Sequence, residues 1–411
     1  MTMRACRFCD APIAQPFVDL GSTPLANAYL TQAQLSQPEP RYPLRAYVCD
    51  QCWLVQADSF VPPEAIFSHY AYFSSFSDSW VEHARRFTVM ARDRFGLDAS
   101  SQVIEVASND GYLLKHFVAA GVPVLGIEPA ANVAEAARQI GVPTEARFFG
   151  RETALDLVGR SLAADLVIGN NVLAHVPDIN DFVGGLAAVI KPDGVVSMEF
   201  PHLLQLIEGV QFDTVYHEHF YYLSLLAAEK IFAAHGLRIF DVEELSTHGG
   251  SLRIMACLST SNAHETGAGV AKVRADEQAA AFDRIETYAA FQNRVIPVKT
   301  GLLAFLEQAV REGKSVAAYG AAAKGNTLLN FSGVDASRID YVVDRNPAKQ
   351  GHYLPGSHLP ILPPERIAET RPDYLLILPW NIRDEVMESM AGIRQWGGHF
   401  VVAVPELTVL P

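Results

Sequence analysis

The fold is decided by the stretch Val103-Ile104-Glu105-Val106-Ala107-Ser108-Asn109-Asp110-Gly111. Its apolar beginning is typical of a short buried strand, and small, turn-forming residues then lead into a helix-like pattern. An acidic-x-Gly-x-Gly-x-Gly loop would have glycine at positions 107, 109 and 111, where this chain has Ala107, Asn109 and Gly111. These residues are small or tolerate turns, so a ligand could still approach the backbone closely. Taken alone, the loop fits an S-adenosylmethionine site, a dinucleotide site or a turn that binds nothing.

Two further strand ends favour the first of these three interpretations. The next strand ends in Gly126-Ile127-Glu128-Pro129, where a carboxylate can accept hydrogen bonds from both ribose hydroxyls. Another ends in Gly169-Asn170-Asn171, shortly before His175; the alternatives there are a strand-end cap and an ordinary helix-face histidine. Ligands of such sheets bind at the carboxyl ends of strands, so the three ends should converge on S-adenosylmethionine. The expected cofactor contacts are Glu105, Ala107, Asn109, Gly111, Tyr112, Leu113, Glu128, Pro129, Asn170 and Asn171.

The pattern around this stretch alternates strands and helices, which predicts a parallel, doubly wound α/β unit. We expect a helix at 79–95, strands at 102–106, 123–127, 164–169 and 194–200, and helices at 112–120, 132–140 and 179–190. Residues 30–43 read as a loop, and the Ala-rich, charged segment 267–312 as one or two long helices. A second α/β unit follows, with strands at 315–319, 339–344, 374–378 and 399–403 and a helix at 324–331.

Composition narrows the classes of function and the compartment. The formal net charge of −14 disfavours binding to bulk nucleic acid, although a few local cations could still hold a nucleotide-linked small molecule. No apolar run approaches the roughly 18 residues of a membrane helix. The residues after Met1 form no secretory apolar region. We therefore expect a cytoplasmic protein with no membrane partner.

Four of the five cysteines form two Cys-x2-Cys pairs, Cys6 with Cys9 and Cys49 with Cys52. Each pair can present two thiolates to one tetrahedral zinc, and four thiolates leave no open position, so we expect structural zinc. The alternatives are two disulfides, which are rare in the cytoplasm, unlinked core thiols, or a redox pair. Cys257 lies in a strand-like run and is expected to be a small buried hydrophobic residue.

A second polar cluster, Tyr216-His217-Glu218-His219, lies among apolar residues. Burying such groups without a role is costly, and histidine suits proton abstraction near neutral pH. The spacing is not that of a HExxH zinc hydrolase. Catalysis is the favoured interpretation; a purely structural network, or a metal bound by His217 and His219 on one face of a strand, stays open.

Taken together, these motifs resemble the sugar C-methyltransferases of deoxysugar biosynthesis, especially the C-3 enzymes that act on dTDP-linked 4-keto sugars. The resemblance covers nearly the whole chain. It rests on the cysteine pairs, Val18–Asn27, Glu105–Leu114, Gly126–Ala130, Tyr216–His219, Thr247–Arg253 and Tyr319–Asn326.

The resemblance implies three domains: a zinc-binding domain at 1–75, a methyltransferase domain at 76–262, and a helical linker with a Rossmann-like domain at 263–411. The nucleotide sugar is expected between domains, in a monomer or weak oligomer. The family implies His219 as the base with Glu218 beside it. It also implies that Tyr216, Tyr70 and His175 line the site, with Tyr70 the least secure match because Tyr72 is close by. Expected substrate contacts are Tyr72, His217, His248, Lys324 and Asn326.

The chemistry that we expect is removal of a proton next to a ketone by His219 and attack of the resulting enolate on the methyl group. Tyr216 and His175 are candidate donors to the enolate oxygen. The loop from Gly320 to Asn326, with Lys324, could hold a diphosphate or be an ordinary turn. The rival functions are methylation of another activated carbonyl compound, a nicotinamide-dependent oxidoreductase, and a zinc scaffold without activity.

Overall fold

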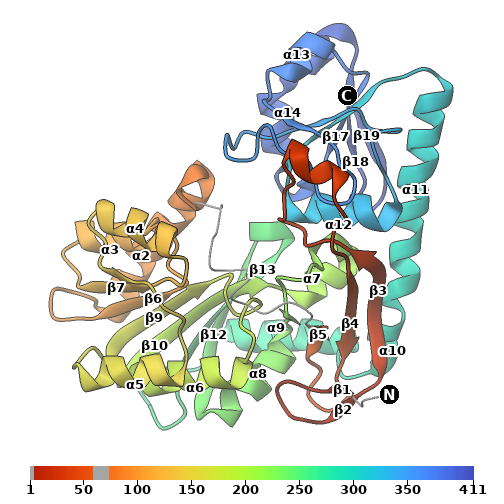
Figure 1. Ribbon diagram of the computed structural model, residues 1–411. Coiled ribbons are helices and arrows are strands. Elements are labelled where there is room, and N and C mark those ends of the chain that lie inside the picture. Colours follow the sequence, from red (N-terminus) through yellow and green to blue (C-terminus); the bar gives the residue numbers. More distant parts are fainter. Residues whose placement is uncertain (1–3, 59–73) are drawn as a thin grey trace.

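The computed structural model describes residues 4–58 and 74–411, and its largest element is a central seven-stranded sheet (Figure 1). The strand order is β12-β13-β10-β9-β6-β7-β8. The strands from β10 to β8 run parallel, which confirms the predicted α/β unit, whereas an antiparallel hairpin of β12 and β13 closes one edge. The bounds are β6 Val103–Val106, β7 Val124–Ile127, β8 Thr144–Glu145, β9 Ala164–Asn170, β10 Ile190–Pro201, β12 Leu237–Leu245 and β13 Ser251–Leu258.

Side chains alternate along the parallel strands, so each face of the sheet has its own core. Val103 packs on one face with α2, α3 and α4, and Ile104 on the other with α5, α6 and α8. Figure 1 shows the two sets of helices on opposite sides of the strands. Ser77 caps α2 by accepting a hydrogen bond from the Trp80 N–H, and Gly96 ends it with φ of 63°. The bounds are α2 Asp78–Phe95, α3 Leu114–Ala119, α4 Ala131–Gln139, α5 Arg151–Gly159, α6 Ile179–Val189, α7 Leu203–Glu208 and α8 Leu225–Ala234.

The N-terminal region forms a two-stranded hairpin and a four-stranded antiparallel sheet. The sheet order is β11-β5-β4-β3, so it includes a strand from the middle of the chain. The segment 30–43, expected as loop, contains a short 3₁₀ helix at Gln32–Ser36 and the start of β4. The bounds are β1 Arg4–Ala5, β2 Pro12–Ile13, β3 Gln15–Thr23, β4 Tyr42–Val48, β5 Val55–Ala57 and β11 Tyr221–Tyr222.

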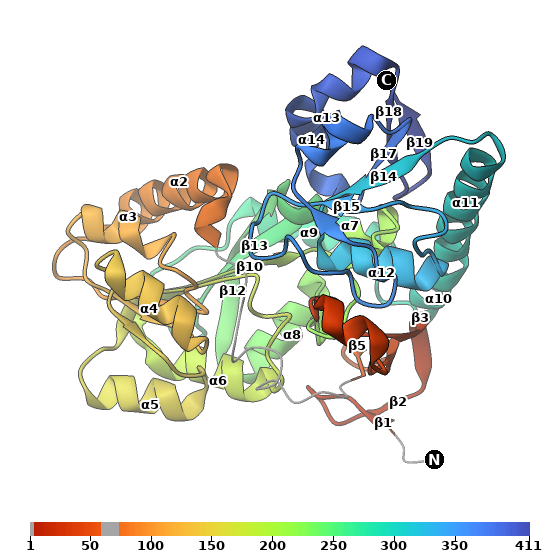
Figure 2. The ribbon, with the colours of Figure 1, turned by 45° about the horizontal axis from the view of Figure 1, so that its top comes forward.

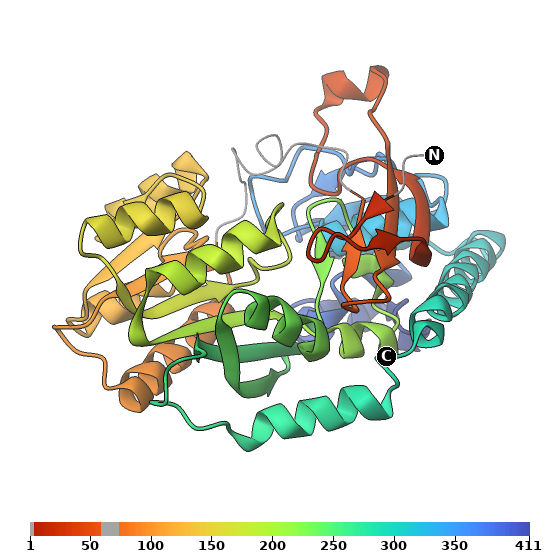
Figure 3. The same cartoon turned by 90° about the horizontal axis from the view of Figure 1, so that it is seen from below.

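Three helices, rather than the expected one or two, lead to the C-terminal unit. Figure 3 shows α9 along the β12 side of the central sheet, and α11 runs past β3 toward the second sheet. The helix bounds are α9 Ala268–Ala279, α10 Ile285–Ala289 and α11 Phe291–Arg311. Among the described residues, no helix is both long and apolar enough to span a lipid bilayer.

The C-terminal unit is a second, mostly parallel sheet in the order β16-β15-β14-β17-β18-β19, with only β19 antiparallel to its neighbour. Its first helix, α12, lies next to α11 and reaches back to β3 and the Phe212–Thr214 turn (Figure 2). The bounds are β14 Val316–Tyr319, β15 Val342–Val343, β16 Ile361–Leu362, β17 Tyr374–Ile377, β18 His399–Val402, β19 Thr408–Leu410, α12 Ala323–Ser332, α13 Arg366–Thr370 and α14 Arg383–Ser389.

Candidate active site

The two cysteine pairs form matching hairpin turns. In the first, the Asp10 N–H donates to the Cys6 carbonyl at 3.0 Å; in the second, the Trp53 N–H donates to the Cys49 carbonyl at 2.9 Å. Asp10 and Trp53 each follow the second cysteine of a pair, and both have left-handed backbones, with φ of 59° and 67°. The same local structure is therefore used twice.

The four sulfurs meet at one point. The Sγ atoms of Cys6 and Cys52 are 3.5 Å apart, those of Cys9 and Cys49 are 3.6 Å apart, and all four lie within 4.8 Å of one another. None is in a disulfide. A tetrahedral zinc with bonds of about 2.3 Å places its sulfur ligands about 3.8 Å from one another, so this cluster fits zinc. Four thiolates complete the coordination sphere, which makes the role structural.

The loop after β6 has left-handed backbone at two positions where this chain does not have the glycine of the consensus loop. Ala107, Asn109 and Gly111 have φ of 53°, 50° and 78°, at the three positions where the consensus loop has glycine. Left-handed backbone is uncommon for alanine, and such strain concentrates at functional sites. Of the other expected cofactor residues nearby, Leu113 has its side chain in the core, whereas Pro129 is half-buried.

Carboxylates gather at this end of the sheet. Both carboxyl oxygens of Glu105 are buried and have no hydrogen-bond partner among the described residues, and the same holds for Asp110 Oδ1. Burial, then the charges of Glu128 and Asp110, raise the pKa of Glu105 well above its ordinary value. Glu128 accepts from the Asn109 N–H at 3.0 Å and the Ala130 N–H at 2.9 Å. Buried oxygens that have no hydrogen-bond partner in the protein need a donor from a ligand. The amino and hydroxyl groups of S-adenosylmethionine are such donors, so these residues fit that cofactor.

Polar side chains at the end of β9 lie beside these carboxylates. Asn170 Nδ2 donates to the Tyr112 hydroxyl at 3.3 Å, and Asn171, with φ of 53°, directs its Nδ2 to Nε2 of His248 at 3.0 Å. The Oδ1 atoms of Asn170 and Asn171 are buried without a partner among the described residues. Trp80 of α2 stacks on Tyr112 with ring centroids 6.1 Å apart and meets the His248 ring edge-on at 5.2 Å. The sequence predicted Trp80 only as part of the helix at 79–95 and gave no indication of a place in this site.

The His219 imidazole has a defined tautomer. Its Nδ1 lies 2.8 Å from the Thr214 carbonyl, which can only accept, so Nδ1 carries the proton and Nε2 a lone pair. Burial, with the nearby His175 and a lysine, lowers the pKa of His219 well below its ordinary value, so the ring is neutral. The ring centroids of Tyr216 and His175 are 4.0 and 4.6 Å from that of His219. His175 donates from Nδ1 to the Glu218 carbonyl at 2.8 Å, and burial lowers its pKa to about 4.

Glu218 and His217 point to different neighbours. Glu218 is buried, and its Oε2 accepts from Asn27 Nδ2 at 2.7 Å. Burial raises the pKa of Glu218 to about 7. His217 faces the N-terminal sheet, where its Nε2 donates to the Pro43 carbonyl at 3.2 Å and its ring meets Tyr42 edge-on. The segment is a turn and not a strand, so the condition for His217 and His219 to share one strand face and bind a metal is not met.

Lys324, at the start of α12, lies between the two α/β units. Its Nζ is 3.0 Å from Asn381 Oδ1, 3.5 Å from the His248 carbonyl and 4.6 Å from the Trp380 ring centroid. Burial lowers the pKa of Lys324 to about 8, although Asp213 opposes this. Burial also raises the pKa of Asp213 to about 6, and its Oδ2 accepts from Trp380 Nε1 at 2.7 Å. His248 thus touches both Asn171 at the cofactor end and this cation.

Asn326 is another expected substrate contact. Asn326 is buried, and its Nδ2 donates to the Ala26 carbonyl at 2.6 Å, so the side chain joins α12 to the N-terminal region. Tyr70 and Tyr72 lie outside the described residues.

Sequence reasoning missed a buried ion network beside the site. Glu199 accepts from Arg253 Nη2 and His83 Nε2, each at 2.8 Å, and from the Thr247 hydroxyl at 2.9 Å. Burial acts to raise the pKa of Glu199, but His83 and Arg253 outweigh it and hold the pKa below its ordinary value. The network joins α2 to β10 and β13 next to His248. A charged residue inside an apolar strand is the one signal that could have found it.

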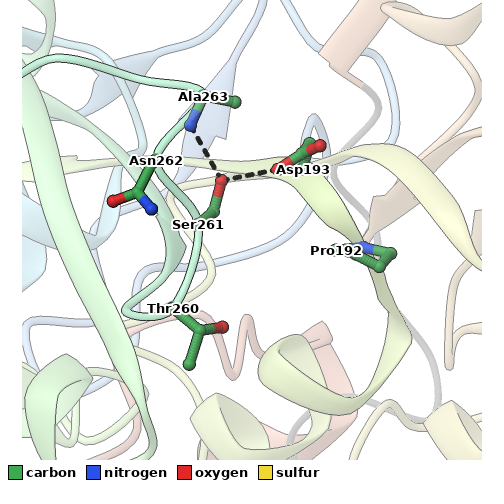
Figure 4. Close-up of a pocket in the computed structure, with 6 residues that line it drawn as sticks. All are labelled: Pro192, Asp193, Thr260, Ser261, Asn262 and Ala263. Atoms are coloured by element: carbon green, nitrogen blue, oxygen red, sulfur yellow. Dashed lines mark hydrogen bonds between the residues drawn. The ribbon is translucent and has the colours of Figure 1, made fainter.

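A small cleft lies at the opposite, amino end of the central strands (Figure 4). Its lining includes Asp193 and Ser261, and the Ser261 hydroxyl donates to Asp193 Oδ1 at 2.7 Å and accepts from the Ala263 N–H at 3.2 Å. These polar groups already pair with one another. This cleft therefore presents fewer unpaired hydrogen-bonding groups to a ligand than the site at the carboxyl end of the strands does.

Three family profiles match consecutive parts of the chain. They are a zinc binding domain at residues 6–67, a methyltransferase domain at 80–242 and a C-methyltransferase C-terminal domain at 246–405. C-methyltransferase NovU from Streptomyces niveus is 36% identical over 405 residues, which are 98% of this chain and 96% of NovU.

Other relatives match less of the chain. A ubiquinone biosynthesis O-methyltransferase from Rhodopseudomonas palustris (strain BisA53) is 29% identical over 98 residues, which are 24% of this chain and 39% of that protein. Among solved structures, the PH0226 protein from Pyrococcus horikoshii OT3 is 14% identical with a TM-score of 0.37, covering 49% of this chain and 100% of that one.

Proposed function

Because the chain belongs to the family of S-adenosylmethionine-dependent C-methyltransferases, we propose that it methylates the carbon next to the ketone of a nucleotide-linked 4-keto-deoxysugar. The proposed position is C-3 and the proposed nucleotide is dTDP. The comparisons give no support to a nicotinamide-dependent oxidoreductase. Methylation of another activated carbonyl compound is the second candidate, because the proposed base requires only a substrate with an acidic C–H next to a carbonyl group.

One observation carries the proposal: the His219 ring is neutral and has its lone pair on Nε2. The Thr214 carbonyl fixes this tautomer, and the neighbouring rings of Tyr216 and His175 hold the imidazole in place. A neutral, oriented imidazole is the group that a C–H deprotonation needs near neutral pH.

The proposed reaction begins at His219. His219 Nε2 takes the proton from the substrate carbon, and the C–H electrons form the enolate. S-adenosylmethionine, when bound, supplies the electrophilic methyl group. Glu105, Glu128 and Asn171 would hold this donor so that the enolate carbon could take the methyl group, with the electron pair of the broken methyl–sulfur bond left on sulfur. A positioned base contributes about 10²–10⁴-fold to such a rate.

The donor to the enolate oxygen is better supplied by Tyr216 than by His175. The proton of His175 Nδ1 is already given to the Glu218 carbonyl, and a pKa of about 4 leaves its Nε2 unprotonated. Tyr216 carries a hydroxyl proton and lies against the base. An oriented donor of this kind contributes about 10²–10³-fold.

The nucleotide diphosphate is proposed to bind at the start of α12. Lys324 is the cation on this side of the site, and the first N–H groups of a helix favour an anion. We also propose the domain division at residues 75 and 262, with β11 as a strand of the first domain's sheet that comes from the second domain's part of the chain.

The test uses the purified protein, the methyl donor and a dTDP-4-keto-6-deoxysugar. We expect transfer of one methyl group to C-3 and, in D₂O without the donor, exchange of deuterium at C-3. His219→Asn should keep zinc and S-adenosylhomocysteine binding while both transfer and exchange fall by orders of magnitude. Near-normal turnover of His219→Asn would reject the base. No transfer to any 4-keto sugar nucleotide, with cofactor binding intact, would reject the substrate class.

A further inference from the structure

The N-terminal region contributes a side chain directly to the catalytic segment. Asn27 is far from Glu218 in sequence, yet its amide Nδ2 lies 2.7 Å from Glu218 Oε2. Asn27 belongs to the turn that follows β3, in which the Tyr29 N–H donates to the Asn27 carbonyl at 3.0 Å. Asn27 is the last residue of the motif Val18–Asn27, whose pattern does not predict a contact with the catalytic segment.

The turn that carries Asn27 is anchored on both sides by the C-terminal unit. On one side, Asn326 Nδ2 donates to the Ala26 carbonyl at 2.6 Å. On the other, the Tyr29 hydroxyl donates to the Ala321 carbonyl at 2.6 Å. Asn27 is therefore presented from a turn whose position is fixed by the same loop and helix that begin with Gly320.

The orientation of the Asn27 amide follows from its surroundings. The Glu218 carboxylate can only accept, so the NH₂ group of Asn27 faces it, and Asn27 Oδ1 lies on the other side, 3.2 Å from the Tyr29 hydroxyl. An amide N–H that donates to a carboxylate stabilises the charged form over the neutral form. The Asn27 bond opposes the effect of burial on the pKa of Glu218.

In the part of the chain that the structure describes, Glu218 forms no salt bridge, and burial and the Asn27 bond are the influences on its pKa. The ionisable groups around it are His175, whose ring bonds the Glu218 carbonyl, and His219 and Tyr216 on its own segment. Tyr29 lies beyond Asn27, and Lys324 of α12 acts on His219. Among the described residues, the Asn27 amide is the contact that favours a charged Glu218 carboxyl.

We propose that Asn27 is a positioning residue for Glu218, whose carboxyl it holds in one orientation and whose charged form it favours against the effect of burial; this rests on the proposed role of Glu218 beside the base. Asn27 acts through Glu218 and is assigned no contact with the reacting atoms. The domain that binds zinc thereby takes part in setting the charge of the catalytic centre.

The test measures the carboxyl titration directly, without turnover. Infrared difference spectra between each protein and its Glu218→Gln counterpart isolate the band of this carboxyl as pH is varied. Asn27→Leu should raise the Glu218 midpoint by about one pH unit, the size expected for loss of one such bond. Asn27→Asp, which keeps the shape of the side chain, should also raise it because it puts a like charge beside the carboxyl.

The matched control is Tyr29→Phe, which removes the anchor to Ala321 but leaves the Asn27 amide. It should leave the Glu218 midpoint in place, whereas a midpoint that moves as far in Tyr29→Phe as in Asn27→Leu would assign the effect to the turn. An unchanged midpoint in both Asn27 variants would overturn the proposal. The acidic limb of the kcat/KM profile should move with the midpoint. Absence of turnover on every keto sugar would instead reject the proposed function, and the spectra would still decide the role of Asn27.

Discussion

Gln56 of β5 lies directly opposite Tyr221 of β11, and this pair joins the cysteine cluster to the segment that carries His219. Gln56 Nε2 donates to the sulfur of Cys6 at 3.2 Å, while Tyr221 is the second residue after His219. Arg7, within the first cysteine turn, adds a second link, because its guanidinium donates to the Ala57 carbonyl at 2.5 Å and to the Phe220 carbonyl at 3.4 Å. The β5–β11 pair and Arg7 therefore link the cysteine cluster to the segment that carries the proposed base.

Arg7→Ala should reduce turnover without removing zinc. The variant loses the hydrogen bonds from the cysteine turn to the backbone beside His219, and a small misplacement of a catalytic group costs up to about 100-fold in rate. Arg4→Ala is the control, since Arg4 lies in the same hairpin but pairs with Asp58 at the surface. Zinc content, S-adenosylhomocysteine affinity and kcat are the measurements. Equal kcat values in the two variants would show that the link has no catalytic effect.

Cys52→Ser should remove most of the bound zinc and lower the melting temperature. A structural tetrahedral site contributes directly to folding, and three thiolates hold zinc less tightly than four. Cys257→Ser is the control because Cys257 is buried in β13, away from the cluster. Metal analysis should give one zinc per chain for the parent and the control. Full retention of zinc by Cys52→Ser would be incompatible with the four-cysteine site.

Glu105→Gln should weaken cofactor binding while leaving the ligand-free protein at least as stable. Both Glu105 oxygens are buried and have no hydrogen-bond partner among the residues that the structure describes, so the change removes an unfavourable buried acid. A hydrogen bond to a charged group is worth about 1.5–3 kcal/mol, so S-adenosylhomocysteine affinity should fall about 10- to 100-fold. Glu135→Gln, on the exposed side of α4, should leave the affinity unchanged. Calorimetric titration and thermal unfolding measure both effects; unchanged affinity in Glu105→Gln would remove this residue from the cofactor site.

The alternating pattern of residues 102–200 was enough to predict the parallel strands β6, β7, β9 and β10, because strand and helix periodicities are local. It did not predict that Ala107 and Asn109 take left-handed backbone, since neither side chain requires it. The two-residue strand β11 could not be predicted either, because its pairing with β5 depends on tertiary contacts rather than on a local pattern. The same applies to the contact between Asn27 and Glu218, whose residues come together only when all three units are folded.

Glu218→Gln should change the pH dependence of stability. The pKa of Glu218 is about 7 in the folded protein against an ordinary value of 4.5. Between these values the folded state binds more protons than the unfolded state, so the free energy of unfolding falls as pH rises through this window. The glutamine variant loses this dependence and should exceed the parent by up to about 3 kcal/mol at pH 8, with the advantage disappearing toward pH 4.5. Urea unfolding at several pH values measures it; parallel curves for the two proteins would contradict the raised pKa.

Lys324→Ala should raise the KM for the sugar nucleotide more than it lowers kcat. Lys324 is held between Asn381, Trp380 and the His248 carbonyl at the start of α12, where the proposed diphosphate would meet its charge. A contact made equally in the ground and transition states contributes to binding alone, so its loss appears in KM. Lys314→Ala is the control because Lys314 lies at the other end of β14, paired with Asp373. An unchanged KM in Lys324→Ala, with a large fall in kcat, would contradict the diphosphate contact. It would indicate instead that the lysine stabilises charge that develops next to His219 during the reaction, because Lys324 already lowers the pKa of that ring.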